Sequence, residues 1–574
     1  MKKHLFTFLF VASAICSIAQ EQITTLFERE ADFERFSGTV LIVNKGNVLL
    51  HNSYGYADNK NSVKNTVETP FDIGSVSKQF TAAVILSLVH DQRIDLNTPI
   101  NNYLGPYGSK KWKHITVHHL LTHTSGIPSL FQSNNGTDDI FPSASPIEID
   151  KLVNSFRSKK LKFKPGKQYS YSNSGYLLLA LIIENVSGQR YGEYLQNELF
   201  NKYDLTNTSF GPKGNEFAKP HFNYHDDMTE EGTVFHQNWM LGAGGIYSTA
   251  SDLYKWTQVI QNDTFLNEEL RRVYLNGHVK TQRGKYAYGW DVAKSKEGTI
   301  ISHDGTNMGY VSYCGFNIDN GDAVIITTNQ TYPTFETVGR SEEYIHHLVN
   351  KTWKNLNGDL INTLPQLAQN EPDIGTYTFE DGYQIQITKD DEKHYVTGIG
   401  DYSPARMAFQ HALSNTDSTS QRVIQMANAF KTKKFKDIKP FCDKQMQFAV
   451  KTGIIKLGFG LITKHLGTIS KITPYYAENG LGKVRLYGEN GVMDIKIYLN
   501  EKNEVQGIFE GGSYSKNGTL TLKLHGVDKE QFLIDGFPYG EEDALITMSE
   551  KELVIEQLGR RFKAQKEQPI AQKK

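Results

Sequence analysis

Residues 71–89 read Phe-Asp-Ile-Gly-Ser-Val-Ser-Lys-Gln-Phe-Thr-Ala-Ala-Val-Ile-Leu-Ser-Leu-Val. From Ser75 onward the apolar residues recur at helical spacing, which predicts a helix with a broad apolar face. Ser75 and Lys78 lie three residues apart and share one side of this helix, so the lysine amine can lie beside the serine hydroxyl. A lysine withdrawn from water has a lowered pKa and can act as a base, and the helix dipole favours negative charge at Ser75. The stretch therefore makes Ser75 a candidate nucleophile, to be weighed with the other motifs.

The Ser-x-x-Lys pattern is not specific by itself, because a second copy at 513–516 runs into a Ser-Lys-Asn-Gly stretch that predicts a turn. A further pattern, Tyr171-Ser172-Asn173, precedes the continuous apolar run 177–183, which predicts a buried helix from about 175 to 186. A loop at that place can present Tyr171 as a second base and Asn173 as an amide donor. Tyr-x-Asn also occurs at 274–276 and 498–500, so it too needs support from its surroundings.

His303-Asp304-Gly305 precedes a strand-like run at 309–316, and Gly305 would let a substrate lie close against the backbone. A lone histidine in such a place is usually structural. The segment 120–128 predicts a turn that ends a helix, and we expect His123 to cap or brace it. The segment 242–245, Gly-Ala-Gly-Gly, predicts a close-packed turn, because no strand–loop–helix unit or following Lys-Ser/Thr supports a phosphate loop.

The surrounding pattern predicts strands, then many helices, then strands. Residues 38–54 predict a hairpin with its turn at Lys45-Gly46, and 253–260 predicts a helix capped by Ser251-Asp252. Strand-like runs return at 309–316 and 323–328. This order is typical of an α+β domain in which helices pack on an antiparallel sheet.

Taken in order, these motifs resemble the serine β-lactamase and penicillin-binding family, and most closely its class C-type branch of DD-peptidases, D-amino-acid peptidases and esterases. The resemblance covers roughly residues 22–350. Further phrases that carry it are Phe71-Asp72-Ile73-Gly74, Asp95-Leu96-Asn97-Thr98-Pro99-Ile100, Leu120 to Pro128 and Gly244-Gly245-Ile246-Tyr247-Ser248-Thr249. The resemblance implies a β-lactamase/transpeptidase-like fold, an antiparallel sheet packed with helices.

The resemblance also implies roles for single residues. Ser75 matches the nucleophile and Lys78 its partner base. Tyr171 matches the tyrosine that exchanges protons with the nucleophile and leaving group, and Asn173 matches the amide that orients substrate. The backbone N–H groups of Ser75 and Thr306 would form the oxyanion hole.

His303-Asp304-Gly305 stands where many relatives carry Lys-Thr-Gly, which implies that His303 and Gly305 line the substrate. A histidine is mostly neutral near pH 7, so this departure weakens the capture of a substrate carboxylate. The reaction implied is acyl transfer through a covalent acyl-enzyme. No metal or other cofactor is expected, since no Cys/His cluster has zinc spacing.

The N-terminus predicts export. Lys2 and Lys3 precede a mostly apolar run that ends at Cys16, and Ser17-Ile18-Ala19 fits a signal-peptidase site, so residues 1–19 form the expected signal peptide. Lipid anchoring through Cys16 is less favoured, because the residues before it make a poor lipobox. The expected location is periplasmic or secreted, with no transmembrane segment in the mature chain.

Composition indicates a globular protein with several domains. Its 574 residues are 39% hydrophobic and 22% charged, and the formal net charge of −1 argues against nucleic-acid binding. The polar stretch 356–372 predicts a linker between a hydrolase domain, 20–355, and a C-terminal α+β accessory region, 373–574. Within that region, 417–510 resembles cystatin-like or nuclear-transport-factor-two-like domains, a helix against a curved sheet. Cys314 and Cys442, expected in different domains, are predicted to be buried thiols rather than a disulfide.

Two functional hypotheses remain open. The first is an exported serine hydrolase that cleaves an amide or ester, on D-amino-acid peptides or cell-wall fragments such as those of peptidoglycan. The second is a penicillin-binding or sensor protein that is acylated slowly and does not turn over. The presence of both Lys78 and Tyr171 favours the enzyme, because a pure binding protein does not need two bases.

Overall fold

In the N-terminal part of the chain, this computed structural model describes residues 19–32, 35–130, 142–223, 229–262, 265–295, 298–331 and 335–358. In the C-terminal part it describes residues 371–379, 384–390, 393–399, 418–453, 455–456, 459–460, 464–478, 481–500, 502–515, 521–528, 531–534, 544–549, 552–557 and 560–566. The chain divides into two compact units, Met1–Leu364 and Pro365–Lys574. The stretch expected as a linker, 356–372, contains this division. Almost all of the expected signal peptide lies outside the described residues, and the first described element is a helix at 19–32.

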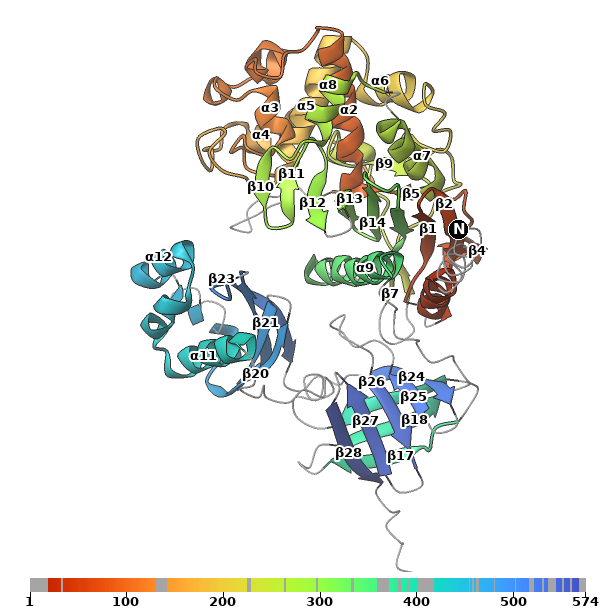
Figure 1. Cartoon of the computed structure of the whole chain (residues 1–574), viewed down its shortest axis with the longest axis vertical. Coiled ribbons are helices and arrows are strands. Elements are labelled where there is room, and N and C mark those ends of the chain that lie inside the picture. The colour runs from red at the N-terminus through yellow and green to blue at the C-terminus, as the bar shows by residue number, and fades with distance from the viewer. Residues whose placement is uncertain are drawn as a thin grey trace, which may run out of the picture. The chain divides into compact units, whose positions relative to one another are not determined.

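Unit 1 is built on an eight-stranded sheet in the order β10-β11-β12-β13-β14-β15-β1-β2 (Figure 1). The predicted hairpin forms its far edge, since β1 pairs with β2 through the turn at Lys45-Gly46. β1 also pairs antiparallel with β15, with Thr39 opposite Thr327, so the two ends of the domain sequence meet in one sheet. The strands are β1 (Gly38–Asn44), β2 (Asn47–Tyr54), β10 (Val279–Thr281), β11 (Gly284–Tyr286), β12 (Asp291–Ser295), β13 (Gly298–Asn307), β14 (Tyr310–Asn317) and β15 (Ala323–Thr328).

Helices cover both faces of this sheet, and Figure 1 shows α9 on the side opposite the main helical layer. Alternate residues of β1 face the two layers: Val40 and Ile42 pack with α9 and the helix at 19–32, whereas Leu41 and Val43 join the larger core. This alternation is the physical basis of the three-layer arrangement. The helices of unit 1 that follow 19–32 are α2 (Ser77–His90), α3 (Val117–Leu121), α4 (Ile149–Arg157), α5 (Asn173–Ser187), α6 (Tyr191–Leu195), α7 (Ala250–Gln261), α8 (Glu268–Leu275) and α9 (Phe335–Leu356).

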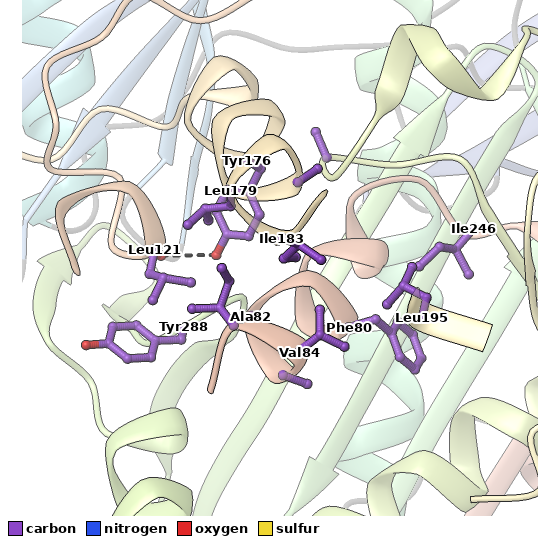
Figure 2. Close-up of a cluster of buried hydrophobic side chains, with 14 of the residues drawn as sticks. Phe80, Ala82, Val84, Leu121, Tyr176, Leu179, Ile183, Leu195, Ile246 and Tyr288 are labelled. Atoms are coloured by element: carbon purple, nitrogen blue, oxygen red, sulfur yellow. Dashed lines mark hydrogen bonds between the residues drawn. The ribbon is translucent and has the colours of Figure 1, made fainter. Parts of the chain in front are cut away.

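The larger core lies around α2 and α5, the two helices with the strongest apolar patterns in the sequence. Residues 174–183 of α5 are all buried, as the continuous apolar run predicted. Figure 2 shows Phe80, Ala82 and Val84 of α2 among side chains that include Leu179 and Ile183. The Tyr176 hydroxyl donates a hydrogen bond to the carbonyl oxygen of Leu121, so the buried phenol is satisfied (Figure 2). Both helices are therefore fixed by packing within this core.

Two local expectations were wrong. The side chain that caps α7 is Thr249, whose hydroxyl accepts from the Asp252 amide, and not Ser251-Asp252 as predicted. Asp252 instead accepts from Thr208 and Asn207, because its position in the first turn points it at that neighbouring loop. Ser513, expected in a turn, lies in strand β23, while the following stretch 516–520 is outside the described residues.

Short sheets complete unit 1. One has the order β5-β9-β6, another β16-β7-β8, and β3 pairs with β4. The first of these matters for the site, because β5 leads directly into the Ser75 turn. Their strands are β3 (Tyr56–Asp58), β4 (Val63–Lys64), β5 (Phe71–Asp72), β6 (Ser209–Phe210), β7 (His221–Asn223), β8 (Thr229–Glu231), β9 (Ile246–Ser248) and β16 (Gln330–Thr331).

Unit 2 contains a closed barrel and a helix-plus-sheet insertion. The barrel joins β17 (Gly375–Phe379), β18 (Gln384–Asp390), β19 (Lys393–Ile399), β24 (Thr521–Asp528), β25 (Gln531–Ile534), β26 (Ala544–Met548), β27 (Glu552–Gln557) and β28 (Arg560–Lys566). Between β19 and β24 the chain forms α11 (Ser418–Thr432), α12 (Lys444–Thr452), β20 (Ile469–Glu478), β21 (Leu481–Gly488), β22 (Gly491–Leu499) and β23 (Val505–Ser515). The helix and sheet expected at 417–510 are present. The barrel, whose strands precede and follow them in the sequence, was not predicted.

The core of the insertion explains why its helix was visible in the sequence. Val423, Met426 and Phe430 of α11 pack against Val484 and Ile495 of the four-stranded sheet β20–β23. Cys442 lies in this core and Cys314 in that of unit 1, and both are free thiols, as predicted. Among the residues that the structure describes, no helix is long and apolar enough to cross a membrane.

Candidate active site

Ser75 and Lys78 lie at the junction of a short 3₁₀ turn, Gly74–Val76, with α2. Lys78 Nζ lies 2.9 Å from Ser75 Oγ and donates to the carbonyl oxygen of Ala243 at 2.7 Å. Lys78 has no exposed surface, whereas Ser75 remains partly exposed. The predicted pairing of serine and lysine is therefore present, on a serine that is partly exposed.

Burial holds the pKa of Lys78 well below its usual range, and the negative charge of Asp304 only partly opposes this. The aromatic rings of Tyr171 and Tyr176 lie 4.9 and 5.5 Å from Nζ and contribute to the dry surroundings. A neutral amine keeps a lone pair, which can face Ser75 Oγ while an N–H remains on Ala243. The arrangement suits a lysine that accepts a proton from the serine.

The predicted glycine-rich turn at 242–245 carries the Ala243 carbonyl that accepts from Lys78. Gly242 has φ 74°, and a Cβ there would lie 2.3 Å from the carbonyl oxygen of Tyr176. Only glycine allows such an approach of the turn to α5. The segment is thus a close-packed turn, as expected, and it places the Ala243 carbonyl against the lysine.

Tyr171 lies on the loop before α5 and faces Lys78 and Ser75. Burial raises the pKa of Tyr171 well above its usual value, and a hydrogen-bonding interaction with Ser75 opposes this only in part. The phenol is therefore protonated at neutral pH. Ser172 caps α5 by accepting from the Gly175 amide, so the helix start fixes the loop that carries Tyr171.

Asn173, the first residue of α5, has its backbone N–H bonded to Ser129 Oγ at 2.9 Å. Its side-chain oxygen is buried and has no hydrogen-bond partner. An unsatisfied buried acceptor costs about 1–3 kcal/mol, so this oxygen has unused hydrogen-bonding capacity.

His123 braces the turn that carries Tyr171, as expected for a structural histidine. It has φ 56°, is 1% exposed, and its Nδ1 accepts from the Ser172 amide at 3.1 Å. Its ring lies 4.2 Å, centroid to centroid, from that of Tyr171. The turn at 120–128 therefore contributes to the site through this ring, which the sequence alone did not reveal.

The His303 side chain is buried and bonded within the protein. Its ring is 4% exposed, with Nε2 3.1 Å from the Tyr286 hydroxyl and Nδ1 2.5 Å from the Asp304 carbonyl oxygen. Burial lowers its pKa to about 4, so the ring is neutral at pH 7. Both nitrogens have partners within the protein, which revises the expectation that His303 contacts substrate directly.

Strand β13 meets the Ser75 turn at very close range. A Cβ on Gly305 would lie 2.0 Å from the Ile73 carbonyl oxygen and 2.9 Å from the Ser75 amide nitrogen, and one on Gly74 would lie 2.8 Å from the Thr306 nitrogen. The space that a Cβ on Gly305 would need is thus filled by the protein's own backbone. The amides of Ser75 and Thr306 are brought side by side by this contact.

A buried carboxylate holds the two segments together. Asp72 accepts from the Gly74 amide at 2.8 Å and from the Asn307 side chain at 2.9 Å, while Ser312 donates to the Ile73 carbonyl at 2.7 Å. Asp72 therefore ties the nucleophile turn to the end of β13. Sequence reasoning missed this role, because nothing local distinguishes Asp72 from other acidic residues.

The other copies of the motifs lie elsewhere. Tyr274 is a buried residue of α8 whose hydroxyl donates to the Gln79 carbonyl, and Tyr498 belongs to β22 in unit 2. Ser513 lies on a strand and not at a helix start. Within the described ranges no group of three His, Cys, Asp or Glu side chains could hold a metal ion.

Comparisons with known proteins show which family this chain resembles. The model of the family described as Beta-lactamase matches residues 24–347, more than half of the chain. Penicillin-binding protein 4* of Bacillus subtilis (strain 168) is 26% identical over 404 residues, which cover 66% of this chain and 88% of that protein. Protein flp of Staphylococcus aureus (strain NCTC 8325 / PS 47) is 26% identical over 357 residues, covering 60% and 67%.

Two solved structures are similar in fold. The octameric penicillin-binding protein homologue from Pyrococcus abyssi has a TM-score of 0.52 and 18% identity, covering 95% of this chain and 99% of that one. The D-amino acid amidase from Ochrobactrum anthropi SV3, in complex with L-phenylalanine amide, has a TM-score of 0.51 and 20% identity, covering 60% and 99%. The family match and the ordered motifs point the same way, and the chain belongs to the serine β-lactamase and penicillin-binding protein family.

Proposed function

We propose that the protein is an exported serine hydrolase that cleaves an amide or ester through an acyl-enzyme on Ser75. The observation that carries this proposal is the 2.9 Å separation of Lys78 Nζ from Ser75 Oγ, with the lysine wholly buried and its pKa lowered. A lysine paired in this way to a partly exposed serine is costly to bury and serves to activate the hydroxyl.

In the proposed reaction, Ser75 Oγ attacks the substrate carbonyl carbon while neutral Lys78 takes the hydroxyl proton. The oxygen of the tetrahedral intermediate is stabilised by the N–H groups of Ser75 and Thr306, which the contact between Gly305 and the Ser75 turn brings together. Tyr171 gives its proton to the leaving group and recovers one from Lys78. Water then attacks the acyl-enzyme, the acid is released, and Ser75 regains its proton.

Asn173 supports an amide substrate in this scheme. Its buried, unpartnered side-chain oxygen would accept an N–H from the acyl side of a peptide. In this proposal His303 and Gly305 support the site without contacting substrate, because their close neighbours belong to the protein. The substrate class we propose is D-amino-acid peptides or cell-wall fragments, a choice supported by relatives named penicillin-binding proteins.

A fluorescent phosphonate that reacts with serine nucleophiles tests the assignment. The wild type should take up one label per chain, Ser75→Ala should take up none, and Ser513→Ala, the matched control for the second motif, should label normally. Lys78→Ala should lose activity comparably to Ser75→Ala, because the two residues act as one unit. Labelling that persists in Ser75→Ala would overturn the assignment.

Product release separates the two hypotheses. Incubation with short activated esters, D-aminoacyl amides and cell-wall peptides should release many equivalents of product per chain from at least one class. One rapid equivalent followed by no turnover would show a slowly acylated binding protein instead. Export is tested by sequencing the N-terminus of the protein recovered outside the cytoplasm, which should begin at Gln20.

A further inference from the structure

Three buried side chains that the proposed chemistry does not use form a hydrogen-bonded row beside Tyr171. His123 Nε2 lies 3.2 Å from the Tyr286 hydroxyl, and the same hydroxyl lies 3.1 Å from His303 Nε2. Exposure of the three ranges only from 1% to 4%. They come from the turn after α3, from β11 and from β13, so the row links segments that are far apart in the sequence.

The partners at the ends of the row settle where its protons are. The Ser172 amide can only donate, so His123 Nδ1, 3.1 Å away, is the bare acceptor and neutral His123 carries its proton on Nε2. The Asp304 carbonyl can only accept, so His303 Nδ1, 2.5 Å away, carries the proton of that ring and Nε2 is bare. The two rings are therefore opposite tautomers.

Tyr286 is the group that these two tautomers require between them. Its oxygen accepts the Nε2 proton of His123, and its own proton goes to the bare Nε2 of His303. Every donor then has an acceptor, from the Ser172 amide to the Asp304 carbonyl. Such a chain is stable only when both rings are neutral, and burial lowers the pKa of each, to about 4 for His303.

The row contacts the proposed proton carrier over its whole length. The rings of His123, Tyr286 and His303 lie 4.2, 6.4 and 6.3 Å from that of Tyr171, measured between centroids. At the His123 end it also holds the amide of Ser172, the next residue after Tyr171. Reorientation of Tyr286 would unpair both histidines, so the row resists displacement of the Tyr171 loop.

We propose that His123, Tyr286 and His303 form a proton-ordered chain of positioning residues, which fixes Tyr171 against Ser75 and Lys78 and ties the loop before α5 to strand β13. The proposal rests on the proposed function of Ser75, Lys78 and Tyr171. It assigns Tyr286, one of 30 tyrosines in the chain, a role in the rate of acyl transfer without contact with substrate.

The chain offers a matched control at Tyr288, two residues further on. Tyr288 is as buried as Tyr286, and its hydroxyl also bonds a histidine, with 2.7 Å between it and His118 Nδ1. Tyr286→Phe and Tyr288→Phe each remove one buried tyrosine hydroxyl that is hydrogen-bonded to a histidine, so their effects on thermal unfolding should be similar. Only Tyr286→Phe should lower kcat on a small ester, by about tenfold or more, with KM changed by less than about twofold.

The proton order has a readout that does not depend on activity. In the full-length protein labelled with ¹⁵N-histidine, His123 should be neutral with its proton on Nε2 at pH 7, and His303 neutral with its proton on Nδ1. Signals are assigned by their loss in His123→Asn and His303→Asn. In Tyr286→Phe both tautomers should persist, because the Ser172 amide and the Asp304 carbonyl still fix them, but the Nε2 signals of both rings should shift as their bonds to the Tyr286 hydroxyl are lost. In Tyr288→Phe the signals of both rings should stay as in the wild type.

Each outcome decides the proposal. Equal kcat for the wild type and Tyr286→Phe, equal losses in Tyr286→Phe and Tyr288→Phe, or the same tautomer in both rings would each overturn it. If Tyr286→Phe does not fold, the tautomers of the wild type still decide. Absence of Ser75-dependent phosphonate labelling would defeat the proposed function instead, and the labelled histidines would still show whether the chain is ordered as inferred.

Discussion

Replacement of Asp72 by asparagine should make unit 1 more stable at alkaline pH and leave its stability nearly unchanged in acid. Asp72 is 5% exposed, and burial, opposed in part by the bonds from Gly74 and Asn307, raises its pKa from 3.8 to about 6. Because the pKa is higher in the folded chain, folding takes up a proton between these values. The contribution of Asp72 to stability is therefore greatest below pH 3.8 and is lost as the pH rises through about 6.

The magnitude follows from the two pKa values. At about 1.4 kcal/mol per pKa unit, the ionised side chain lowers stability by about 3 kcal/mol at pH 8, and by only about 1 kcal/mol at pH 4.5. Asparagine keeps an acceptor for the Gly74 amide but presents a donor to Asn307, whose oxygen already accepts from Met308. One lost hydrogen bond costs about 1 kcal/mol. Asp72→Asn should thus gain about 2 kcal/mol at pH 8 and almost nothing at pH 4.5.

Tryptophan fluorescence during urea unfolding measures this in the whole chain, because all five tryptophans lie in unit 1. Other titrating groups are common to both proteins and cancel in the difference. Asp58→Asn is the control of opposite sign, since Lys219 at 2.6 Å lowers the pKa of Asp58 to about 2 and its loss should reduce stability at pH 8. If Asp72→Asn is less stable than the wild type at pH 8, burial does not outweigh the hydrogen bonds in setting the pKa of Asp72, and the reasoning is refuted.

Three further outcomes are expected. Gly305→Ala should lower the free energy of unfolding by about 1–3 kcal/mol and abolish ester cleavage, because its Cβ would meet the Ile73 carbonyl. Its control is Gly460→Ala, whose Cβ would have no atom within 4 Å and which should behave as the wild type in the urea titration. Nitrocefin turnover should stay far below roughly 10 s⁻¹, since His303 is neutral and Arg283 is paired with Asp304; faster steady-state turnover would contradict this. A protein truncated after Leu364 should fold and cleave small esters, as measured by thermal unfolding and an ester assay; an insoluble or inactive product would show that unit 2 completes the site.

The truncation proposed after Leu364 differs from the domain end near Asn355 that the sequence suggested. The polar stretch from 356 onward suggested an end near Asn355, but Asn355 lies in the last turn of α9 and donates to the Gln22 side chain at 2.6 Å. A chain cut there would lose the end of a helix that packs on the sheet. The division between the two compact units falls between Leu364 and Pro365, beyond the end of α9 at Leu356.

Local patterns in the sequence were sufficient for the elements whose stability is local. Helix α2 follows from apolar residues at helical spacing and α5 from a continuous apolar run, while the hairpin β1–β2 follows from two β-rich runs around Lys45-Gly46. The pairing of Ser75 with Lys78 is also local, because residues three apart at a helix start are neighbours whatever surrounds them. The order of the motifs along the chain then indicated the family.

Contacts between distant segments were decided only by the tertiary structure. In the barrel of unit 2, β19 pairs with β24 across the whole insertion, and β17 pairs with β28 to close the ring. Strand periodicity carries no information about which strands pair. In the site, His303 turns inward because Tyr286 and the Asp304 carbonyl satisfy both its nitrogens, and Gly305 is required by the backbone at Ile73. The sequence identified His303 and Gly305 as candidate site residues, but it could not identify their partners. The role of a buried polar group depends on the donor or acceptor that the fold places beside it.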